Sequence, residues 1–370
     1  MERRSVLIGA GSAAVAVGGT AVAWRLAAGS PSAYAQYADR LREPLPERAE
    51  IEDLIRYATL AANSHNTQPW RFIASADAID ILPDLTRATP AVDPDNHHLF
   101  ISLGCAMENL VVAATASGRP GTVSVREDGS QRYAFSRATP RPDALLQAIA
   151  QRQSTRAAYG GTPVAVQDIE ALQRAAAAPG VHAAILTERA QINRVRDLVV
   201  AGNDAQLADA AFMAELKAWL RFSPRSAMAT GDGLYAPASG NPAMPEALGG
   251  HAFDLFFTPS AEREKYARHI ESSAGVAVWI AERQEPAHWV AVGRAFQRFA
   301  LTATSLGLKH AHINQPVEVA SLRPQLASLL GLPNLSPDLV VRFGHGPTLP
   351  FSPRRPMSSV MQMGARGPVT

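Results

Sequence analysis

The chain has 370 residues, 47% hydrophobic and 18% charged, an ordinary globular balance with enough length for two domain-sized units. Its 35 basic and 33 acidic residues give a net charge of only +2, which argues against a nucleic acid or an acidic polymer as partner. The single cysteine, Cys105, excludes an intramolecular disulfide and any Cys-x-x-Cys zinc or redox site. We expect Cys105 to be a small apolar residue in a helix.

The first 35 residues have the composition of an export signal. Arg3 and Arg4 form a twin-arginine pair, the stretch from 5 to 24 is uncharged, and Ala33 and Ala35 form an Ala-x-Ala-like cleavage site. We predict a twin-arginine signal that is either cleaved or kept as a membrane anchor. The protein would then be periplasmic, or anchored on the outer side of the cytoplasmic membrane. Proteins exported by this route leave the cytoplasm folded, often with a cofactor already bound.

A competing interpretation of the same segment is a dinucleotide-binding turn. Gly9, Gly11 and Ala14 match Gly-x-Gly-x-x-Ala after a short apolar run. That fingerprint requires an acidic residue about 20 positions further on. The chain has none between Glu2 and Asp39, so the signal is favoured.

The rest of the chain contains an internal repeat. The stretch "IEDLIRYA" at 51–58 aligns with "IEALQRAA" at 169–176, an offset of 169 − 51 = 118. The stretch "GCAMENLVVAATASG" at 104–118 aligns with "GRAFQRFALTATSLG" at 293–307, an offset of 293 − 104 = 189. Both helices of the second pair carry small residues on one face and end at glycine. We predict two copies of one α+β unit, a dimer fused into one polypeptide.

The predicted boundaries place the first half at 45–140, the second at 141–357 and a tail at 358–370. The offsets differ by 189 − 118 = 71, so the second copy carries about 71 additional residues between its two helices. Within them, 223–259 is rich in glycine and proline and lacks clear periodicity. Such a segment is expected to be an irregular lid or binding loop. Four aromatic residues favour a lid over disorder: Tyr235, Phe253, Phe256 and Phe257.

Periodicity predicts helices near 50–62, 103–117, 143–151, 166–177, 190–220, 260–273, 286–306 and 319–330. It predicts strands near 69–75, 78–82, 121–126, 182–187, 275–281, 309–313 and 338–344, the first two forming a hairpin.

Three clusters of residues could carry chemistry. The stretch "AANSHNTQPW" offers amide and hydroxyl groups between a helix and a strand, which suits a flat, polar-edged ligand, although a helix cap with a turn explains it equally well. Arg152, Ser154 and Arg156 form an Arg-x-Ser-x-Arg phosphate grip, or else a solvated basic helix end. Arg354 and Arg355 lie between prolines in "SPRRP", which holds them in a stiff extended segment or a docked tail.

These clusters carry a resemblance to the FMN-dependent nitroreductase family. "AANSHNTQPW" resembles that family's polar loop, with Ala62-Asn63 in place of Pro-Ser, and "RQSTR" resembles its phosphate motif. "SPRRP" and "INQPVE" occupy the places of its C-terminal basic contacts and of the backbone beside the flavin ring. The phosphate motif follows the loop instead of preceding it. This order is similar to that of the fused, monomeric Acg-like FMN-binding branch.

The resemblance implies one FMN per chain, between the two halves, because the second copy lacks the polar loop and the first lacks the phosphate motif. Arg152, Ser154 and Arg354 or Arg355 would hold the phosphate, and Arg156 the N1/O2 edge of the ring. The remaining contacts to ring and ribityl chain would come from Ala62, Asn63, Ser64, Asn66, Asn314 and Gln315.

No catalytic side chain is implied, because the flavin itself carries the redox chemistry. No metal is predicted: His310 and His312 share one face of a strand, but no carboxylate or thiolate is spaced to join them, and His65, His97 and His98 add none.

The predicted function is an FMN-dependent oxidoreductase that reduces nitroaromatics or quinones by a ping-pong mechanism at flavin N5. NAD(P)H is a candidate donor, but it is a cytoplasmic molecule, so an exported protein would need a different one. The alternative is a protein that binds or sequesters FMN under a closed lid. We expect a monomer that meets a membrane only through its N-terminal segment.

Overall fold

The computed structural model describes residues 24–364, so most of the predicted signal lies outside the described residues. The folded part begins earlier than the sequence analysis predicts. Helix α2 (Pro31–Leu41) starts with Ser30 as its N-cap and proline in its first turn. Tyr34, inside the predicted signal, is buried and donates a hydrogen bond to the carbonyl of Phe351 (2.7 Å). The segment up to residue 35 is therefore partly built into the fold.

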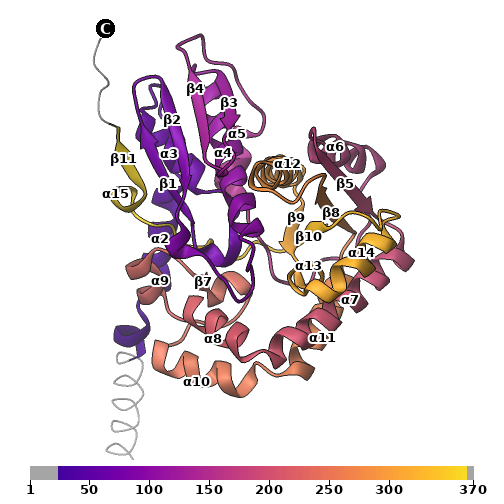
Figure 1. The fold of residues 1–370 in the computed structure, drawn as a ribbon. Helices are drawn as coiled ribbons and strands as arrows, with labels where there is room; N and C mark the ends of the chain where they lie inside the picture. The colour runs from indigo at the N-terminus through magenta and orange to yellow at the C-terminus, as the bar shows by residue number, and fades with distance from the viewer. Residues whose placement is uncertain (1–23, 365–370) are drawn as a thin grey trace, which may run out of the picture.

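Two sheets, antiparallel except for one strand pair, lie on either side of a central pair of helices (Figure 1). The first sheet has the order β11-β1-β2-β4-β3 and the second β5-β8-β10-β9. The first sheet consists of β1 (Trp70–Ala74), β2 (Ala78–Pro83), β3 (Gly121–Val125), β4 (Gln131–Phe135) and β11 (Met361–Met363). The second consists of β5 (Val181–Leu186), β8 (Gly275–Ala281), β9 (Lys309–His312) and β10 (Pro337–Gly344).

The order of the strands confirms the fused repeat. If β1, β2, β3 and β4 correspond to β5, β8, β9 and β10, then β1-β2-β4-β3 becomes β5-β8-β10-β9, the order observed. In each copy one long helix follows the second strand: α4 (His97–Ala116) and α12 (Pro286–Ser305). Short β11 is an addition to the first copy, pairing parallel to β1. The fold is α+β, as predicted, although β4 and β11 were not predicted as strands.

The two long helices cross at the aligned glycines. A Cβ on Gly104 would lie 2.1 Å from the carbonyl oxygen of Val290, and one on Gly293 would lie 2.0 Å from that of Ile101. The repeat offset of 189 relates Gly104 to Gly293 and Ile101 to Val290. The two contacts are therefore equivalent under the repeat, like a pair of contacts related by a dimer's two-fold axis. A second pair of contacts is equivalent in the same way: Glu108 accepts a hydrogen bond from Arg298, and Asn109 accepts one from Gln297. The halves therefore form an intramolecular pseudo-dimer.

Smaller helices complete the two halves. They are α3 (Ile51–Thr59), α5 (Leu146–Gln151), α6 (Val166–Ala176), α13 (Gln315–Glu318), α14 (Arg323–Leu329) and α15 (Met357–Val360). Among residues 24–364, α4 is the one helix long and apolar enough to span a membrane, and 83% of that stretch is buried, as in a core helix.

The additional residues of the second copy lie between β5 and β8, at 187–274, and form the lower part of Figure 1. They contain α7 (Arg189–Ala208), α8 (Ala210–Trp219), α9 (Pro224–Thr230), α10 (Glu246–Phe256), α11 (Pro259–Glu271) and the short strand pair β6 (Leu220–Arg221) and β7 (Leu234–Tyr235). We call 187–274 the insertion.

Two predictions for the insertion are wrong in detail. The helix expected at 190–220 is two helices, because Asp209 is extended and its side chain accepts a hydrogen bond from Ala211 N (2.8 Å) to start α8. The segment 223–259 is largely helical instead of irregular. Ser223 caps α9 with Pro224 in the first turn, a start signal that precedes a helix of only seven residues.

Candidate functional site

Two adjoining cavities lie between the halves. The larger, about 160 Å³, is lined by the polar loop after α3, by α4 and α12, by the segment from β9 to α13, and by the insertion. The smaller, about 50 Å³, is lined by Arg42 at the end of α2, by the Arg-x-Ser-x-Arg motif and by the C-terminal segment. Five residues line both cavities: Ala62, Asn63, Arg156, Leu234 and His312. The polar loop and the arginine motif thus lie at adjoining cavities.

The smaller cavity concentrates positive charge. Arg42, Arg152, Arg156 and Arg354 all line it, and no carboxylate is among its lining residues. Burial lowers the pKa of Arg152 to about 10. Burial also lowers the pKa of Arg42 to about 10, with the charge of Arg152 adding to the effect. An anion bound here would meet strong, poorly solvated donors.

Arg152 is the most informative of these residues. It is buried, and its Nη2 donates to the carbonyl of Leu60 (2.9 Å). Its Nε and Nη1 are also buried, yet neither has a hydrogen-bond partner among the described residues. Leaving two charged donors unpaired in the interior costs free energy. A ligand that accepts from both would remove that cost.

The two C-terminal arginines differ. Arg354 is buried, and its guanidinium donates to the carbonyls of Leu60 and Ala61 (3.1 Å each) and to Asn66 Oδ1 (3.0 Å), so it mainly fixes the end of α3. Arg355 lines neither cavity. It donates to the carbonyl of Gln68 (3.0 Å). The structure therefore does not place Arg355 where the predicted phosphate contact requires it, because consecutive residues in an extended segment point in opposite directions.

The polar loop directs its amides into the protein. Asn66 donates from Nδ2 to the carbonyls of Gly233 (3.0 Å) and Pro353 (3.1 Å), joining the loop to the insertion and the C-terminal segment. Asn63 Oδ1 accepts from the backbone of Gln68 (2.9 Å). These bonds hold His65, Asn66 and Gln68 in left-handed conformations, with φ of 45°, 53° and 54°. Such strain persists only where the surroundings enforce it, and it often marks a functional site.

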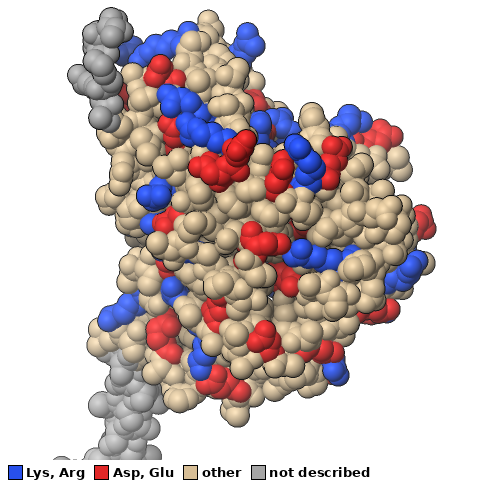
Figure 2. All heavy atoms as spheres, in the orientation of Figure 1, with Lys and Arg blue, Asp and Glu red and all other residues tan. Residues whose placement is uncertain are grey.

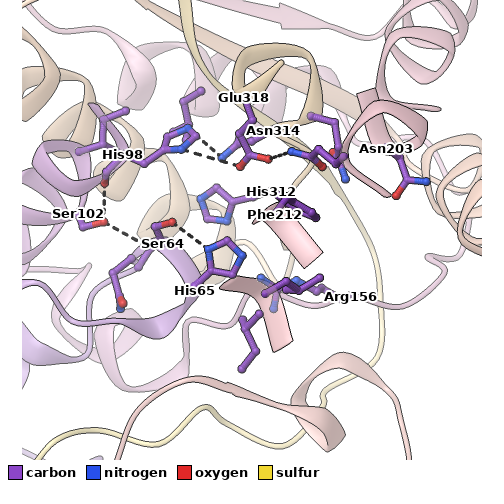
Figure 3. Close-up of a pocket in the computed structure, with 18 of the residues that line it drawn as sticks. Ser64, His65, His98, Ser102, Arg156, Asn203, Phe212, His312, Asn314 and Glu318 are labelled. Carbon is purple, nitrogen blue, oxygen red and sulfur yellow. Dashed lines mark hydrogen bonds and ion pairs between the residues drawn. The ribbon is translucent and has the colours of Figure 1, made fainter. Parts of the chain in front are cut away.

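The loop still presents groups to the larger cavity. Ala62, Asn63, Ser64 and His65 line it, and the backbone N–H of Ser64 is held by Ser102 Oγ of α4 (3.1 Å; Figure 3). Burial, with the nearby charge of Arg156, lowers the pKa of His65 to about 4, so its ring is neutral at pH 7. The loop therefore offers the cavity a neutral polar surface.

The opposite wall comes from the segment after β9. Asn314 is held on both sides: its Oδ1 accepts from Val340 N (2.9 Å) and its Nδ2 lies 3.3 Å from His98 Nε2. Gln315 Oε1 is buried without a partner among the described residues, so it too is available to a ligand. Both predicted residues line the larger cavity, and Figure 3 shows His98 beside Asn314.

Glu318 is a carboxylate that sequence analysis missed. It lines the larger cavity, accepts from Gln206 Nε2 of the insertion (2.6 Å) and lies 3.9 Å from His98 Nδ1. Burial raises its pKa to about 7. The cavity thus holds an acid that gains and loses its proton near neutral pH.

Asp93, His97 and His98 come close enough together to resemble a metal site. However, Asp93 uses both carboxylate oxygens as a helix cap, accepting from the backbone N–H of His98 (3.2 Å) and Leu99 (3.0 Å) at the start of α4. Hydrogen bonds to Asp93 and Asp95 outweigh burial and raise the pKa of His97 to about 9. The group is explained as an ion-paired helix start.

The insertion forms part of the wall of the larger cavity. It contributes eight lining residues: Asn203, Gln206, Leu207, Phe212, Leu216, Leu234, Phe257 and Tyr266. Only Leu234 and Phe257 come from the predicted lid at 223–259. Tyr235 packs on Tyr34 instead, and Phe256 is 71% exposed.

Arg42 is the second residue that sequence analysis missed. It belongs to no motif, and it reaches the smaller cavity because α2 packs beside the C-terminal segment, where its guanidinium lies 3.8 Å from the ring centre of Phe351. Tyr37, also on α2, donates to the carbonyl of Arg354 (2.6 Å). A contact between such distant parts of the chain leaves no local signal.

The chain has similar sequences among known proteins. No family model matches the chain. It is similar to two Mycobacterium tuberculosis proteins that carry NAD(P)H nitroreductase names. It is 25% identical to Rv3131 over 332 residues, covering 86% of this chain and 92% of the relative. It is 22% identical to acg over 330 residues, covering 85% and 96%. The chain is thus similar to both relatives over most of its own length and most of theirs.

Solved structures give more distant likenesses. The FMN-dependent nitroreductase NfnB from Mycobacterium smegmatis, in complex with NADPH, matches with a TM-score of 0.40 and 14% identity, over 60% of this chain and 98% of that one. A nitroreductase with bound FMN from Desulfitobacterium hafniense matches with a TM-score of 0.38 and 17% identity, over 61% and 100%.

Proposed function

We propose that the protein is an FMN-dependent oxidoreductase that holds one FMN across its two adjoining cavities. The observation that carries this proposal is Arg152, with two buried guanidinium donors that have no partner among the described residues. A phosphate group accepts from such donors and balances their charge. Ser154 and Arg42, which line the same cavity, would complete the phosphate site.

The flavin ring would occupy the larger cavity. Arg156 lines both cavities, and its guanidinium forms no hydrogen bond with another described residue. It is therefore available to the edge of the flavin ring that gains negative charge on reduction. Ala62, Asn63 and Ser64 would face the ring from one side, and Asn314 with Gln315 from the other. FMN, when bound, supplies the electron-transfer chemistry, and the chain supplies binding and electrostatics.

NAD(P)H is the donor suggested by the names of the relatives, and a nitroaromatic or quinone is the proposed acceptor. Because donor and acceptor would use the same redox site, they would bind in a ping-pong order. The oxidised donor would leave before the acceptor enters. Glu318, on the cavity wall, is the ionisable group best placed to exchange a proton with a bound molecule.

A second candidate function is sequestration of FMN. It is favoured by the eight insertion residues that line the larger cavity, because the same side chains that cover a flavin also occupy the space a substrate needs. The fixed position of Asn66, bonded to Gly233 of the insertion, would keep such a cover closed.

A visible absorbance spectrum of the purified protein, followed by anaerobic addition of NADPH, separates these possibilities. Oxidised-flavin absorbance at one equivalent per chain supports the proposed site. Loss of that absorbance within seconds supports the oxidoreductase. A flavin that stays oxidised with NADPH but is bleached by dithionite supports sequestration or a different donor. A protein that cannot be loaded with FMN overturns both.

A further inference from the structure

Exposed large apolar side chains gather at one end of the molecule. Nine such residues are exposed in the described part of the chain, and five of them belong to two neighbouring segments: Trp24, Leu26, Leu248, Leu255 and Phe256. Leu255 and Phe256 are 69% and 71% exposed. Solitary exposed apolar residues need no explanation, but a cluster usually marks an interaction surface.

Three of the five belong to α10. Leu248 and Leu255 are seven positions apart, so they project from one side of the helix, and Phe256 lies about 100° further round, at its end. The side next to Phe256 packs on the protein: Gly249 is buried, and a Cβ there would lie 2.2 Å from Phe222. The three exposed side chains therefore form an unpartnered apolar stripe on a helix that is fixed at its adjoining side.

The other two residues belong to a segment that approaches the same part of the insertion. Glu246, at the start of α10, accepts from the backbone N–H groups of Phe222 (2.9 Å) and Ser223 (3.0 Å). Gly29 touches the same segment, because a Cβ there would lie 2.8 Å from the backbone nitrogen of Arg225. Figure 1 shows α10 and residues 24–28 at the same lower end of the molecule.

We propose that this surface, the outer side of α10 together with residues 24–26, rests on a lipid bilayer. The occupant is indicated by the sequence that leads into Trp24, in which twenty consecutive residues, 5–24, carry no charge. A segment of that length and composition suits the hydrocarbon layer. Trp24 and Arg25 follow at its end, residues favoured where hydrocarbon meets headgroups.

The stripe on α10 is an auxiliary contact. It supplies three side chains, far fewer than stable anchoring requires, so its effect is to fix the orientation of a protein that the N-terminal segment already holds. The residue after the stripe, Phe257, lines the larger cavity. The insertion wall of that cavity would thus lie close to the membrane surface.

A cysteine probe on the full chain tests the proposal. Phe256→Cys is labelled with an environment-sensitive fluorophore, which is selective because the native Cys105 is buried. Val166→Cys on α6, also exposed at 73%, is the matched control. Vesicles of phosphatidylethanolamine and phosphatidylglycerol are added, with and without spin-labelled lipids as quenchers.

We expect a blue shift and quenching by the spin-labelled lipids at position 256 and neither at 166. A protein that floats with the vesicles while the label at 256 stays in water would overturn the proposal, because the N-terminal segment would then act alone. A blue shift at 256 that appears without lipid and grows with protein concentration would also overturn it, by showing that a second copy covers the stripe.

Discussion

At the scale of single residues, the polar loop uses its side chains differently from what its composition suggests. Asn63 and Asn66 are predicted as ligand contacts, but the structure uses their amides, together with that of Gln68, to fix a strained backbone. The helix cap and the ligand loop, two alternatives in the sequence, are therefore compatible, since the amides that cap the chain also place its backbone at the cavity. The sequence shows that a side chain is polar, but it does not show the direction in which that side chain points.

Arg152→Met should separate binding from stability. Charge-assisted hydrogen bonds contribute about 1.5–3 kcal/mol each, so loss of the guanidinium should weaken FMN binding at least about tenfold, as measured by quenching of FMN fluorescence. Without FMN, the unfolding temperature should not fall, because two unpaired buried donors are removed as well. Arg174→Met, at an exposed position on α6, is the control and should change neither. A lower unfolding temperature with unchanged affinity would make Arg152 structural.

Glu318 should make stability depend on pH. Its pKa is raised from 4.5 to about 7, so the folded protein binds this proton more tightly than the unfolded chain does. The resulting stabilisation is complete below about pH 4.5 and is lost as the pH rises through 7. Glu318→Gln should therefore gain unfolding free energy relative to the wild type over that window, by on the order of 1–3 kcal/mol.

Urea unfolding at several pH values between 4.5 and 8.5 measures this difference. Glu264→Gln on α11, an exposed glutamate, is the control and should show no such gain. A difference for Glu318→Gln that stays constant across the range would contradict the raised pKa.

At the scale of elements, the crossing of α4 and α12 is the most constrained feature of the fold. Gly104→Ala would place a Cβ 2.1 Å from a backbone oxygen of the facing helix, which can be relieved only by moving the helices apart. We expect a loss of about 3 kcal/mol or more in unfolding free energy, measured by chemical denaturation.

Gly250→Ala in α10 is the matched substitution. Its Cβ would meet nothing nearer than Lys217 Cε at 3.9 Å. Because alanine favours a helix interior over glycine, this variant should gain about 0.5–1 kcal/mol. Equal effects at the two positions would show that the crossing is not closely packed.

The same crossing explains which elements could be predicted from sequence. Two helices whose backbones are in contact require small residues at the crossing. Gly104 and Gly293 meet this requirement at equivalent positions, which makes the repeat recognisable in the sequence. The insertion has no equivalent in the other copy. Its short helices are stabilised by tertiary packing, so local sequence patterns do not predict them. Arg42 reaches the site through tertiary contacts and stands in no motif. Glu318 ends the quoted stretch "INQPVE", but nothing in that stretch indicates that its carboxylate lines the cavity.

At the scale of the whole molecule, the pseudo-dimer should act as a complete unit. The interface that would join two subunits is internal here, formed by α4 and α12. We expect a mass near 39.4 kDa by light scattering at all concentrations, with one FMN bound per chain. Half an equivalent of FMN together with a doubled mass would instead show a site shared between two chains.

The C-terminal strand sets an order on the synthesis of this protein. Phe72 of β1 pairs with Met361 of β11, and Tyr34 on α2 donates to the carbonyl of Phe351. While the ribosome is still making the second half, the first sheet has an unpaired edge and α2 lacks its C-terminal hydrogen-bond partners. The first half can collapse early, but its edge stays open to other nascent strands until β11 emerges. Fusing a dimer into one chain thus removes the search for a partner subunit, but the first sheet is complete only after β11 has been synthesised.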